Sequence, residues 1–388
     1  MATLRFTTAG ESHGPGLVAI VEGLPAGLEL DRNRLDRDMA RRQLGHGRGG
    51  RMKIESDSVE IRSGVRHGRT LGSPIAVLVA NRDYSNWEER MGPWPVDAEV
   101  DEVHTPRPGH ADLAGLLKYG HSDVRNVLER ASARETAARV AAGGIAKELL
   151  RAFGVSVHSH VLQIGSVRAP ERPDAGPDDF DAVDESPVRC LDPEAGEAMV
   201  AEIDRLRKDN ESLGGIFEVR AFGLVPGLGS HVSWDERLDS RLAQALVSIQ
   251  AVKGVSVGEA WEVAGRPGSE SHDEIFWSET EGWHRKTNRA GGVEGGMSNG
   301  EPLTVRAALK PISTLTKPLR SVDTETKQPA EALRERTDST VVPAAGVVGE
   351  AMTALVLARC YREKFGGDHI DDALAALAAY RERIGWRR

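Results

Sequence analysis

Two segments rich in alanine and glycine most restrict the folds open to this chain of 388 residues. "ERASARETAARVAAGG", from Glu129, and "ERTDSTVVPAAGVVGE", from Glu335, both begin with Glu-Arg and lead into a long helical pattern. Their similarity arises either by chance or from an internal duplication, with halves of about 1–200 and 201–388. Under duplication, each half presents an arginine at the start of a helix.

Strand-like and helical segments follow one another without regular βαβ alternation. Strands are predicted at 16–24 and 73–81 and a hairpin at 51–64; helices are predicted at 31–45, 112–120, within 122–154, and at 235–252, 340–367 and 369–385. We interpret 84–109 as a long ordered loop and the acidic, proline-rich segment 169–187 as a surface excursion. This pattern predicts an α+β protein with residues 1–388 in one large domain.

Composition excludes several classes of protein. The net charge of -9 argues against a general nucleic-acid binder, which needs a broad basic face. Cys190 and Cys360 lie far apart, which fits neither a disulfide scaffold nor a zinc site, and we expect no metal. We find no secretory signal and no apolar run of about 18 residues, so we expect no membrane partner and a cytoplasmic location.

Two loops framed by glycine and proline each carry a histidine. "TAGESHGPG" places Ser12 and His13 near the N-terminus, and "HTPRPGHADL" places Arg107 and His110 just before a predicted helix. A lone histidine is usually structural. Two histidines in two such loops favour a pair of acid–base groups, because imidazole titrates near neutral pH.

Glycine-rich and arginine-rich segments indicate anion binding. "GHGRGG", 45–50, matches GxGxxG, but it follows a predicted helix and enters a strand, so we reject a dinucleotide fingerprint. Its glycines and the flanking Arg41, Arg42, Arg48 and Arg51 suit a phosphate, unless they form a solvated basic helix end. Ser132, in "RASAR" with Arg134, and Asp338, in "RTDST" with Arg336, are natural helix caps or anion sites. These residues alone indicate an enzyme for a small, multiply anionic substrate.

The segments "TAGESHG", "GHADLAGLLKYGHSDVRNVLERASARETAARVAAG" and "RTDSTVVPAAGVVGEAM" closely resemble chorismate synthase. "RRQLGHGRGGRMKIESD" and "GGVEGGMSNGEPL" extend the resemblance, which runs to about Leu357. The family converts 5-enolpyruvylshikimate 3-phosphate to chorismate and phosphate, the last step of the shikimate pathway, and requires reduced FMN. The resemblance implies a β-α-β sandwich, with long helices between antiparallel sheets, assembled as a homotetramer.

The resemblance also implies roles for individual residues. His13 protonates the leaving phosphate, His110 supports the anionic reduced flavin near N1, and Asp338 helps keep N5 able to accept hydrogen. The implied substrate or NADP phosphate contacts are Ser12, Arg42, Arg48, Arg107 and Arg134. The implied FMN contacts are Arg130, Ala131, Ser132, Gln250, Ala251, Gly295, Lys310, Pro311, Ile312, Ser313, Thr314 and Arg336, the last of which contacts either ligand.

Two alternative functions stay open at this point. One is a flavin reductase that uses NADPH, and the other is a non-catalytic nucleotide-binding protein. Some chorismate synthases reduce their own flavin with NADPH and others depend on an external supply. The lack of a dinucleotide fingerprint favours external supply, and a non-catalytic protein has no use for His13, His110 and Asp338 together.

Overall fold

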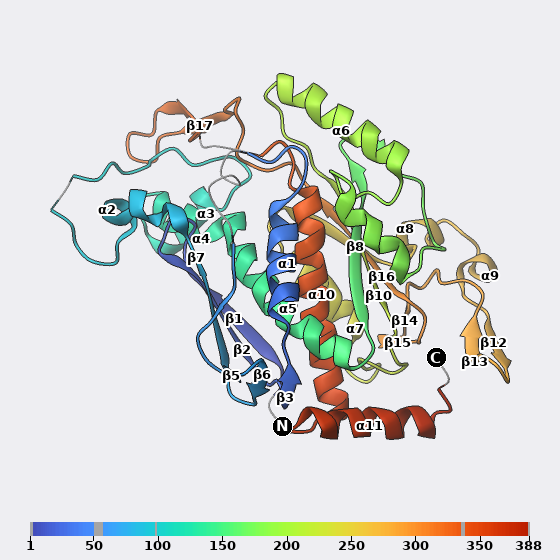
Figure 1. Ribbon diagram of the computed structural model, residues 1–388. Helices are drawn as coiled ribbons and strands as arrows, with labels where there is room; N and C mark the ends of the chain where they lie inside the picture. Colours follow the sequence, from blue (N-terminus) through green and yellow to red (C-terminus); the bar gives the residue numbers. More distant parts are fainter. Residues whose placement is uncertain (1–2, 50–56, 98, 335–337, 387–388) are drawn as a thin grey trace.

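Two antiparallel sheets contain the longer strands of the computed structural model, which describes residues 3–49, 57–97, 99–334 and 338–386 (Figure 1). The first has the order β1 (Arg5–Ala9), β2 (Gly16–Glu22), β7 (Ile75–Ala80) and β4 (Glu60–Ile61). The strands predicted at 16–24 and 73–81 are therefore confirmed as β2 and β7. Of the hairpin predicted at 51–64, residues 51–56 lie outside the described residues, and β4 pairs with β7.

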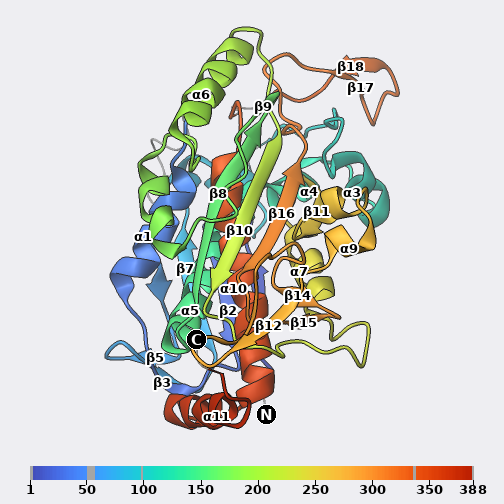
Figure 2. The ribbon, with the colours of Figure 1, turned by 90° about the vertical axis from the view of Figure 1, so that its right-hand side faces the viewer.

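The second sheet is broader, and Figure 2 looks onto it with a long helix behind. Its order is β11 (Val252–Val257), β16 (Leu303–Leu309), β10 (Gly215–Phe222), β8 (Ser156–Ile164) and β9 (Val167–Arg168). The inner strands are apolar: Phe217 and Val219 of β10 and Val305 of β16 have no exposed surface. This sheet therefore offers a continuous apolar face to the helices.

Three helices pack together: α1 (Arg32–Gln43), α5 (Thr136–Ala152) and α10 (Val342–Phe365). α5 packs on β2 and β7, α10 packs on β8 and β10, and the two helices pack on each other. They approach closely because a Cβ on Gly143 would lie 2.3 Å from the Cβ of Ala351. Asp31 caps α1 by accepting a hydrogen bond from the Asn33 N–H at 2.8 Å, as its position before the helix predicts.

A buried carboxylate ties these helices together. Glu350 of α10 accepts hydrogen bonds from Arg41 of α1 at 2.8 Å, Lys147 of α5 at 2.6 Å, Arg189 at 3.2 Å and Ser159 of β8 at 2.7 Å. Burial alone would raise the pKa of Glu350, but Arg41 and Lys147 hold it well below its ordinary value of 4.5. Arg41, which we expected to flank a phosphate loop, therefore pairs with Glu350 inside the protein.

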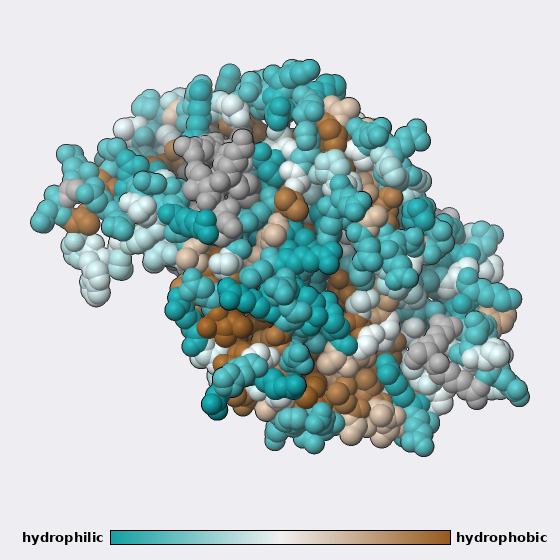
Figure 3. Space-filling view, in the orientation of Figure 1, coloured by the Kyte–Doolittle hydropathy of each residue, from teal (hydrophilic) through white to brown (hydrophobic). Residues whose placement is uncertain are grey.

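One main cluster of buried apolar residues extends from Leu4 to Leu377. α10 is long and apolar enough to pass a length-and-composition test for a membrane span, but 94% of its apolar window is buried inside the protein. α10 is therefore a core helix of this fold. On the face shown in Figure 3, polar side chains cover most of the surface and apolar ones gather in the lower half.

The remaining helices and strands surround this core. The helices are α2 (Glu88–Met91), α3 (Asp112–Tyr119), α4 (Arg125–Ala131), α6 (Pro193–Lys208), α7 (Leu238–Val247), α8 (Ala260–Val263), α9 (Gly268–Ser271) and α11 (Ile370–Arg383). The strands are β3 (Ala26–Glu29), β5 (Val65–Arg66), β6 (Arg69–Leu71), β12 (Ile275–Ser278), β13 (Gly282–Arg285), β14 (Val293–Glu294), β15 (Met297–Ser298), β17 (Arg320–Val322) and β18 (Pro329–Glu331).

The mixed α+β class is confirmed, and several boundaries differ from expectation. The helical pattern within 122–154 divides into α4, a 3₁₀ turn and α5, because Ser132 is extended and caps the turn. Segment 84–109 contains α2, and segment 169–187 is more than a surface excursion, since Phe180 and Val183 are buried. α7 ends at Val247, short of the predicted 252. The internal duplication stays a prediction.

Candidate active site

The loop that carries His13 is the turn between β1 and β2. Gly10 has a φ of 104°, and a Cβ there would lie 2.3 Å from the carbonyl oxygen of Gly16, so the turn requires glycine. The Asn81 amide donates hydrogen bonds to the carbonyls of Glu11 at 3.1 Å and Gly14 at 2.7 Å. The sequence therefore builds a rigid loop around His13, as its glycines and proline predict.

The imidazole of His13 is held on two sides. Its Nδ1 lies 2.8 Å from Oε2 of Glu129, which comes from α4, and its ring stacks on Trp87 with centroids 3.9 Å apart. The side chain of Glu129 is only 1% exposed and that of His13 is 13% exposed. A histidine in this setting has one fixed orientation and one edge left for a ligand.

His110 has a similar support at the start of α3. Its Nδ1 hydrogen-bonds to the buried carboxylate of Asp112, which also accepts from Nε of Arg107 at 2.9 Å. Burial alone would raise the pKa of Asp112, but the hydrogen bonds from His110 and Arg107 lower it to about 2. Asp112 is thus a carboxylate at neutral pH. Arg107 also donates to Oγ1 of Thr314 at 3.1 Å.

Two predicted phosphate-binding arginines meet on one buried carboxylate. Arg42 and Arg134 both donate to Oδ2 of Asp57 at 2.7 Å. Burial is the main cause that lowers the pKa of Arg42 to about 10, and the positive charges of Arg134 and Arg48 act in the same direction. The negative charge of Asp57 raises this pKa but does not offset them. Among the described residues, Nε of Arg42 is buried with no hydrogen-bond partner. The arrangement contradicts a solvated basic helix end and concentrates positive charge.

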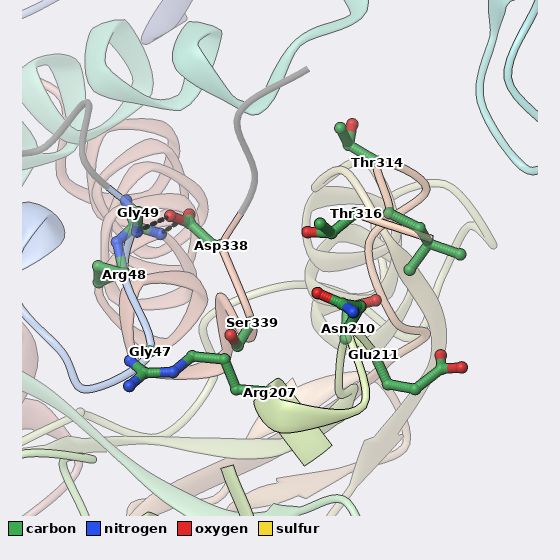
Figure 4. Close-up of a pocket in the computed structure, with 12 residues that line it drawn as sticks. Gly47, Arg48, Gly49, Arg207, Asn210, Glu211, Thr314, Thr316, Asp338 and Ser339 are labelled. Atoms are coloured by element: carbon green, nitrogen blue, oxygen red, sulfur yellow. Dashed lines mark hydrogen bonds and ion pairs between the residues drawn. The ribbon is translucent and has the colours of Figure 1, made fainter. Parts of the chain in front are cut away.

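Arg48 and Asp338 form an ion pair beside a cavity of about 310 Å³. Asp338 accepts from Arg48 at 2.7 Å and from the Gly49 N–H at 2.5 Å. Figure 4 shows these three residues on one wall and Thr314 on the other. The cavity is lined by Gly47, Arg48, Gly49, Arg207, Asn210, Glu211, Ser212, Thr314, Leu315, Thr316, Asp338 and Ser339. Thr314 thus connects this cavity to Arg107 and His110.

Asp338 does not cap α10, contrary to one reading of its sequence. The helix begins at Val342, whose N–H donates to Oγ1 of Thr340 at 3.4 Å rather than to Asp338. The carboxylate lies instead against the glycine-rich loop after α1. The helix-cap explanation for "RTDST" therefore loses its support at this position.

Most of the residues predicted to bind FMN have neighbours among the groups already described. Lys310 donates from Nζ to the Gly109 carbonyl at 2.9 Å and from its backbone N–H to the Ala251 carbonyl at 3.0 Å. Ser313 also donates to the Gly109 carbonyl, at 2.7 Å. Segment 310–314 and residues 250–251 therefore adjoin the His110 loop. Burial, and secondarily Lys253, lower the pKa of Lys310.

The segment Arg130–Ser132 lies against the His13 loop. Arg130 donates to the Thr8 carbonyl at 2.9 Å and to the Gly10 carbonyl at 3.1 Å. The Ser132 hydroxyl lies 3.3 Å from the Ser12 hydroxyl and accepts from the Arg134 N–H at 3.3 Å. Ser132 thus joins the His13 loop to the backbone of Arg134.

One of the predicted FMN residues, Gly295, is not brought to this group. Gly295 lies between β14 and β15, beside the start of α7, where the Leu238 N–H bonds to the Gly296 carbonyl. Gln250 follows the opposite end of α7, a helix of 10 residues and so about 15 Å long. Arg336 and Arg51 lie outside the described residues.

Four residues of the site had no predicted role: Asp57, Trp87, Asp112 and Glu129. Asp112 lies two residues after His110 within "HTPRPGHADL", and Glu129 opens one of the two alanine-rich segments, so both lay in quoted motifs. Asp57 and Trp87 are separated from their partners Arg134 and His13 by more than 70 residues in sequence. No local pattern reveals such pairs.

Comparisons with known proteins identify the family of the chain. The family model described as chorismate synthase matches residues 4–361. A chorismate synthase of Symbiobacterium thermophilum is 58% identical over 394 residues, covering 99% of this chain and 100% of that protein. One of Desulforudis audaxviator is 58% identical over 388 residues, covering 98% of both. A crystal structure of chorismate synthase is 41% identical, with a TM-score of 0.80 and 99% of both chains covered. The chain therefore belongs to the chorismate synthase family.

Proposed function

We propose that this chain removes phosphate from 5-enolpyruvylshikimate 3-phosphate in a 1,4-anti elimination. The C3–O bond breaks, the C6 hydrogen is lost, and the products are chorismate and inorganic phosphate. The observation that carries the proposal is the side-chain amide of Asn81, which donates to the carbonyls of Glu11 and Gly14 in the His13 loop. The same amide accepts from Nε of Arg134, one of the two guanidinium groups on Asp57, at 2.9 Å. A proton donor next to concentrated positive charge is what a departing phosphate requires.

The arginines suit the two carboxylates and one phosphate of this substrate. We assign Arg42, Arg48, Arg107 and Arg134 to these groups, with Arg336 as a further member. Arg42 is the strongest case, since its buried Nε has no partner among the residues that the structure describes. A buried donor of this kind is costly without an acceptor, which a substrate oxygen would supply.

Reduced FMN is the cofactor that we propose, and the residues present fit it. In the described part of the chain, Oε1 of Gln250 is buried without a donor, which an N–H of the flavin ring would supply. Lys310 and Ser313 carry polar groups on the same side of the His110 loop. When bound, reduced FMN supplies the electron density and the hydrogen acceptor that a poorly acidic C6–H requires. We keep Arg130, Ala131, Ser132, Ala251, Gly295 and Lys310 to Thr314 as proposed contacts.

The two histidines take different tasks. We assign His13, near the arginines, to protonate the leaving phosphate, and His110, next to the residues proposed for FMN, to support the charge of the reduced cofactor. Nδ1 of each ring is bonded to a carboxylate, which leaves Nε2 as the nitrogen for proton exchange. Asp338 is assigned to proton handling near the cofactor. A cytoplasmic homotetramer with residues 1–388 as one domain completes the proposal.

Family membership does not favour the flavin reductase or the nucleotide-binding alternative. NADPH as a reductant for bound flavin is a separate question, and we propose external supply. An anaerobic assay with chemically reduced FMN tests both points. We expect stoichiometric chorismate and phosphate without NADPH, and no turnover with oxidised FMN and NADPH. No chorismate with reduced FMN would refute the proposed function, whereas turnover with oxidised FMN and NADPH would refute external supply alone.

Replacing Asp338 by asparagine should lower turnover by at least about 100-fold, the lower end for a positioned acid–base group. Asparagine keeps the size and the acceptor oxygen but cannot handle a proton or hold Arg48 by charge. The measurement is single-turnover chorismate formation under anaerobic conditions with pre-reduced FMN, alongside thermal melts.

Asp192→Asn is the matched control, because Asp192 caps α6 by accepting from the Ala195 N–H at 2.8 Å. Asparagine caps about as well as aspartate, so this variant should keep both its activity and its melting temperature. An Asp338→Asn enzyme with wild-type turnover would remove Asp338 from the chemistry.

A further inference from the structure

We infer that Glu129 is the positioning residue of His13 and selects the ring nitrogen that exchanges a proton with the substrate. The inference rests on the proposed function, because it assumes that His13 is the acid for the leaving phosphate. Neither the sequence motifs nor the resemblance to the family assigned a role to Glu129. Its place at the end of α4 brings it to a loop 116 residues earlier in the chain.

Glu129 holds the His13 loop through both its side chain and its backbone. Its Oε2 accepts from the His13 backbone N–H at 3.0 Å and lies 2.8 Å from Nδ1, while Oε1 lies 3.0 Å from Nδ1. The backbone carbonyl of Glu129 accepts from the Ser12 N–H at 3.0 Å. Two consecutive residues of the loop are thus fixed by one residue of α4.

The carboxylate dictates the tautomer of the ring. An ionised carboxylate accepts hydrogen bonds and cannot donate them, so Nδ1 carries a hydrogen whether the imidazole is neutral or charged. Nε2 is then the one nitrogen whose protonation changes during turnover. A proton donated to phosphate leaves from Nε2, and the ring that remains is already the correct tautomer to be protonated again.

Trp87 and Arg125 hold this pair in place. The rings of His13 and Trp87 stack at 21° between planes, and Arg125 lies 5.1 Å from the Trp87 ring centroid. Nη1 of Arg125 also reaches Oε1 of Glu129 at 3.4 Å. The guanidinium therefore touches both supports of His13 and keeps a positive charge beside the buried carboxylate.

The second histidine has the same arrangement. Asp112 bonds to Nδ1 of His110 and to Arg107, just as Glu129 bonds to Nδ1 of His13 and to Arg125. Each histidine thus has one buried carboxylate, and each carboxylate has one arginine. A third such group, His160 with Glu218 and Arg220, lies inside the second sheet, but its histidine is only 1% exposed. His13 and His110 are 13% and 17% exposed, and this access to a ligand favours a functional explanation for them.

Replacing Glu129 by glutamine tests the inference in the complete enzyme. We expect kcat to fall between about 10-fold, the lower figure for carboxylate partners of metal-bound histidines, and about 10⁴-fold, the figure for the aspartate of a Ser-His-Asp triad. KM should stay within about twofold, because no substrate contact is lost. Glu148→Gln is the matched control: Glu148 is also buried, pairs with Arg34 and Arg151, and should leave kcat unchanged.

A double-mutant cycle separates positioning from a structural effect. In a His13→Ala background, Glu129→Gln should change kcat by less than about twofold, because its only route to the reaction is absent. An equal fall with and without His13 would overturn the inference. If Glu129→Gln melts far below wild type, Glu129→Asp, which keeps a charge beside Arg125, takes its place in the cycle.

The tautomer itself gives a readout that does not depend on turnover. Side-chain ¹⁵N shifts of His13, assigned by their loss in His13→Ala, should show hydrogen on Nδ1 and none on Nε2 at alkaline pH. Glu129→Gln should weaken this preference and Glu148→Gln should not. A wild-type His13 with hydrogen on Nε2 would overturn the inference, even if chorismate is formed. Absence of chorismate with the expected shifts would instead refute the proposed function and leave the positioning of His13 intact.

Discussion

Alanine at His13 or at His110 should each lower turnover by about 10²–10⁴-fold while the protein stays folded. Each ring is held at Nδ1 by a buried carboxylate and is itself only partly exposed, which leaves Nε2 as the nitrogen for the reaction. Neither histidine lies in the main apolar core, so little stability is lost with the ring. Anaerobic single-turnover formation of chorismate with pre-reduced FMN is the measurement.

The two variants should differ in kind. Loss of His110 should disturb the absorbance spectrum of bound reduced FMN, because we place it beside the cofactor, and loss of His13 should not. His284→Ala is the matched control, since His284 is 14% exposed on β13 and bonds to the Gly282 carbonyl, away from the site. Near-wild-type turnover of either site variant would remove that histidine from the mechanism.

Glutamine at Glu350 should lower the free energy of unfolding by about 3–5 kcal/mol, the loss expected when one partner of a buried ion pair is removed. Glu350 has no exposed surface and is bonded by Arg41, Lys147 and Arg189, so glutamine leaves three buried cations without their shared carboxylate. Urea unfolding at pH 7 measures the effect.

The pH dependence should identify its electrostatic origin. The pKa of Glu350 is lower in the folded protein than its ordinary 4.5, so its stabilisation is complete above that pH and is lost as the pH falls below it. The difference between wild type and Glu350→Gln should therefore shrink in acid. Glu363→Gln on the same helix, where the carboxylate is 31% exposed, should cost no more than about 1 kcal/mol. An equal loss in both variants would contradict this explanation.

The elements that could be predicted from the sequence are those with local signals. α1 has a capping aspartate and helical spacing of Leu35 and Met39, and both proved correct. β2 and β7 are short apolar runs bounded by turn residues. α10 was predicted as a long apolar helix. The ion pair of its Glu350 with Arg41, 309 residues earlier in the chain, could not be predicted from the sequence.

The errors have physical reasons. Ser132 interrupts a helical pattern because its hydroxyl caps a new turn. The sequence alone does not distinguish such a capping serine from a serine in the middle of a helix. Arg41 and Arg42 are neighbours in sequence and were expected to act alike. They face different carboxylates, because residues adjacent on a helix point about 100° apart.

The candidate site was predictable in its histidines and not in the groups that orient them. His13 and His110 lie in distinctive loops, whereas Glu129 and Asp57 are single carboxylates among 59 acidic residues. Their importance arises only from tertiary contact. Asp338 was identified through the resemblance. Its contact with Arg48, seen only in the structure, argues against the alternative that it is a helix cap.

The separation in sequence between the partners of this site has a consequence for synthesis on the ribosome. The His13 loop emerges before its partner Glu129, which follows 116 residues later, and Gly49 emerges 289 residues before Asp338. Contacts of such long range form slowly because large chain segments must close first. The nascent chain therefore carries an unfinished site until Asp338 has left the ribosome.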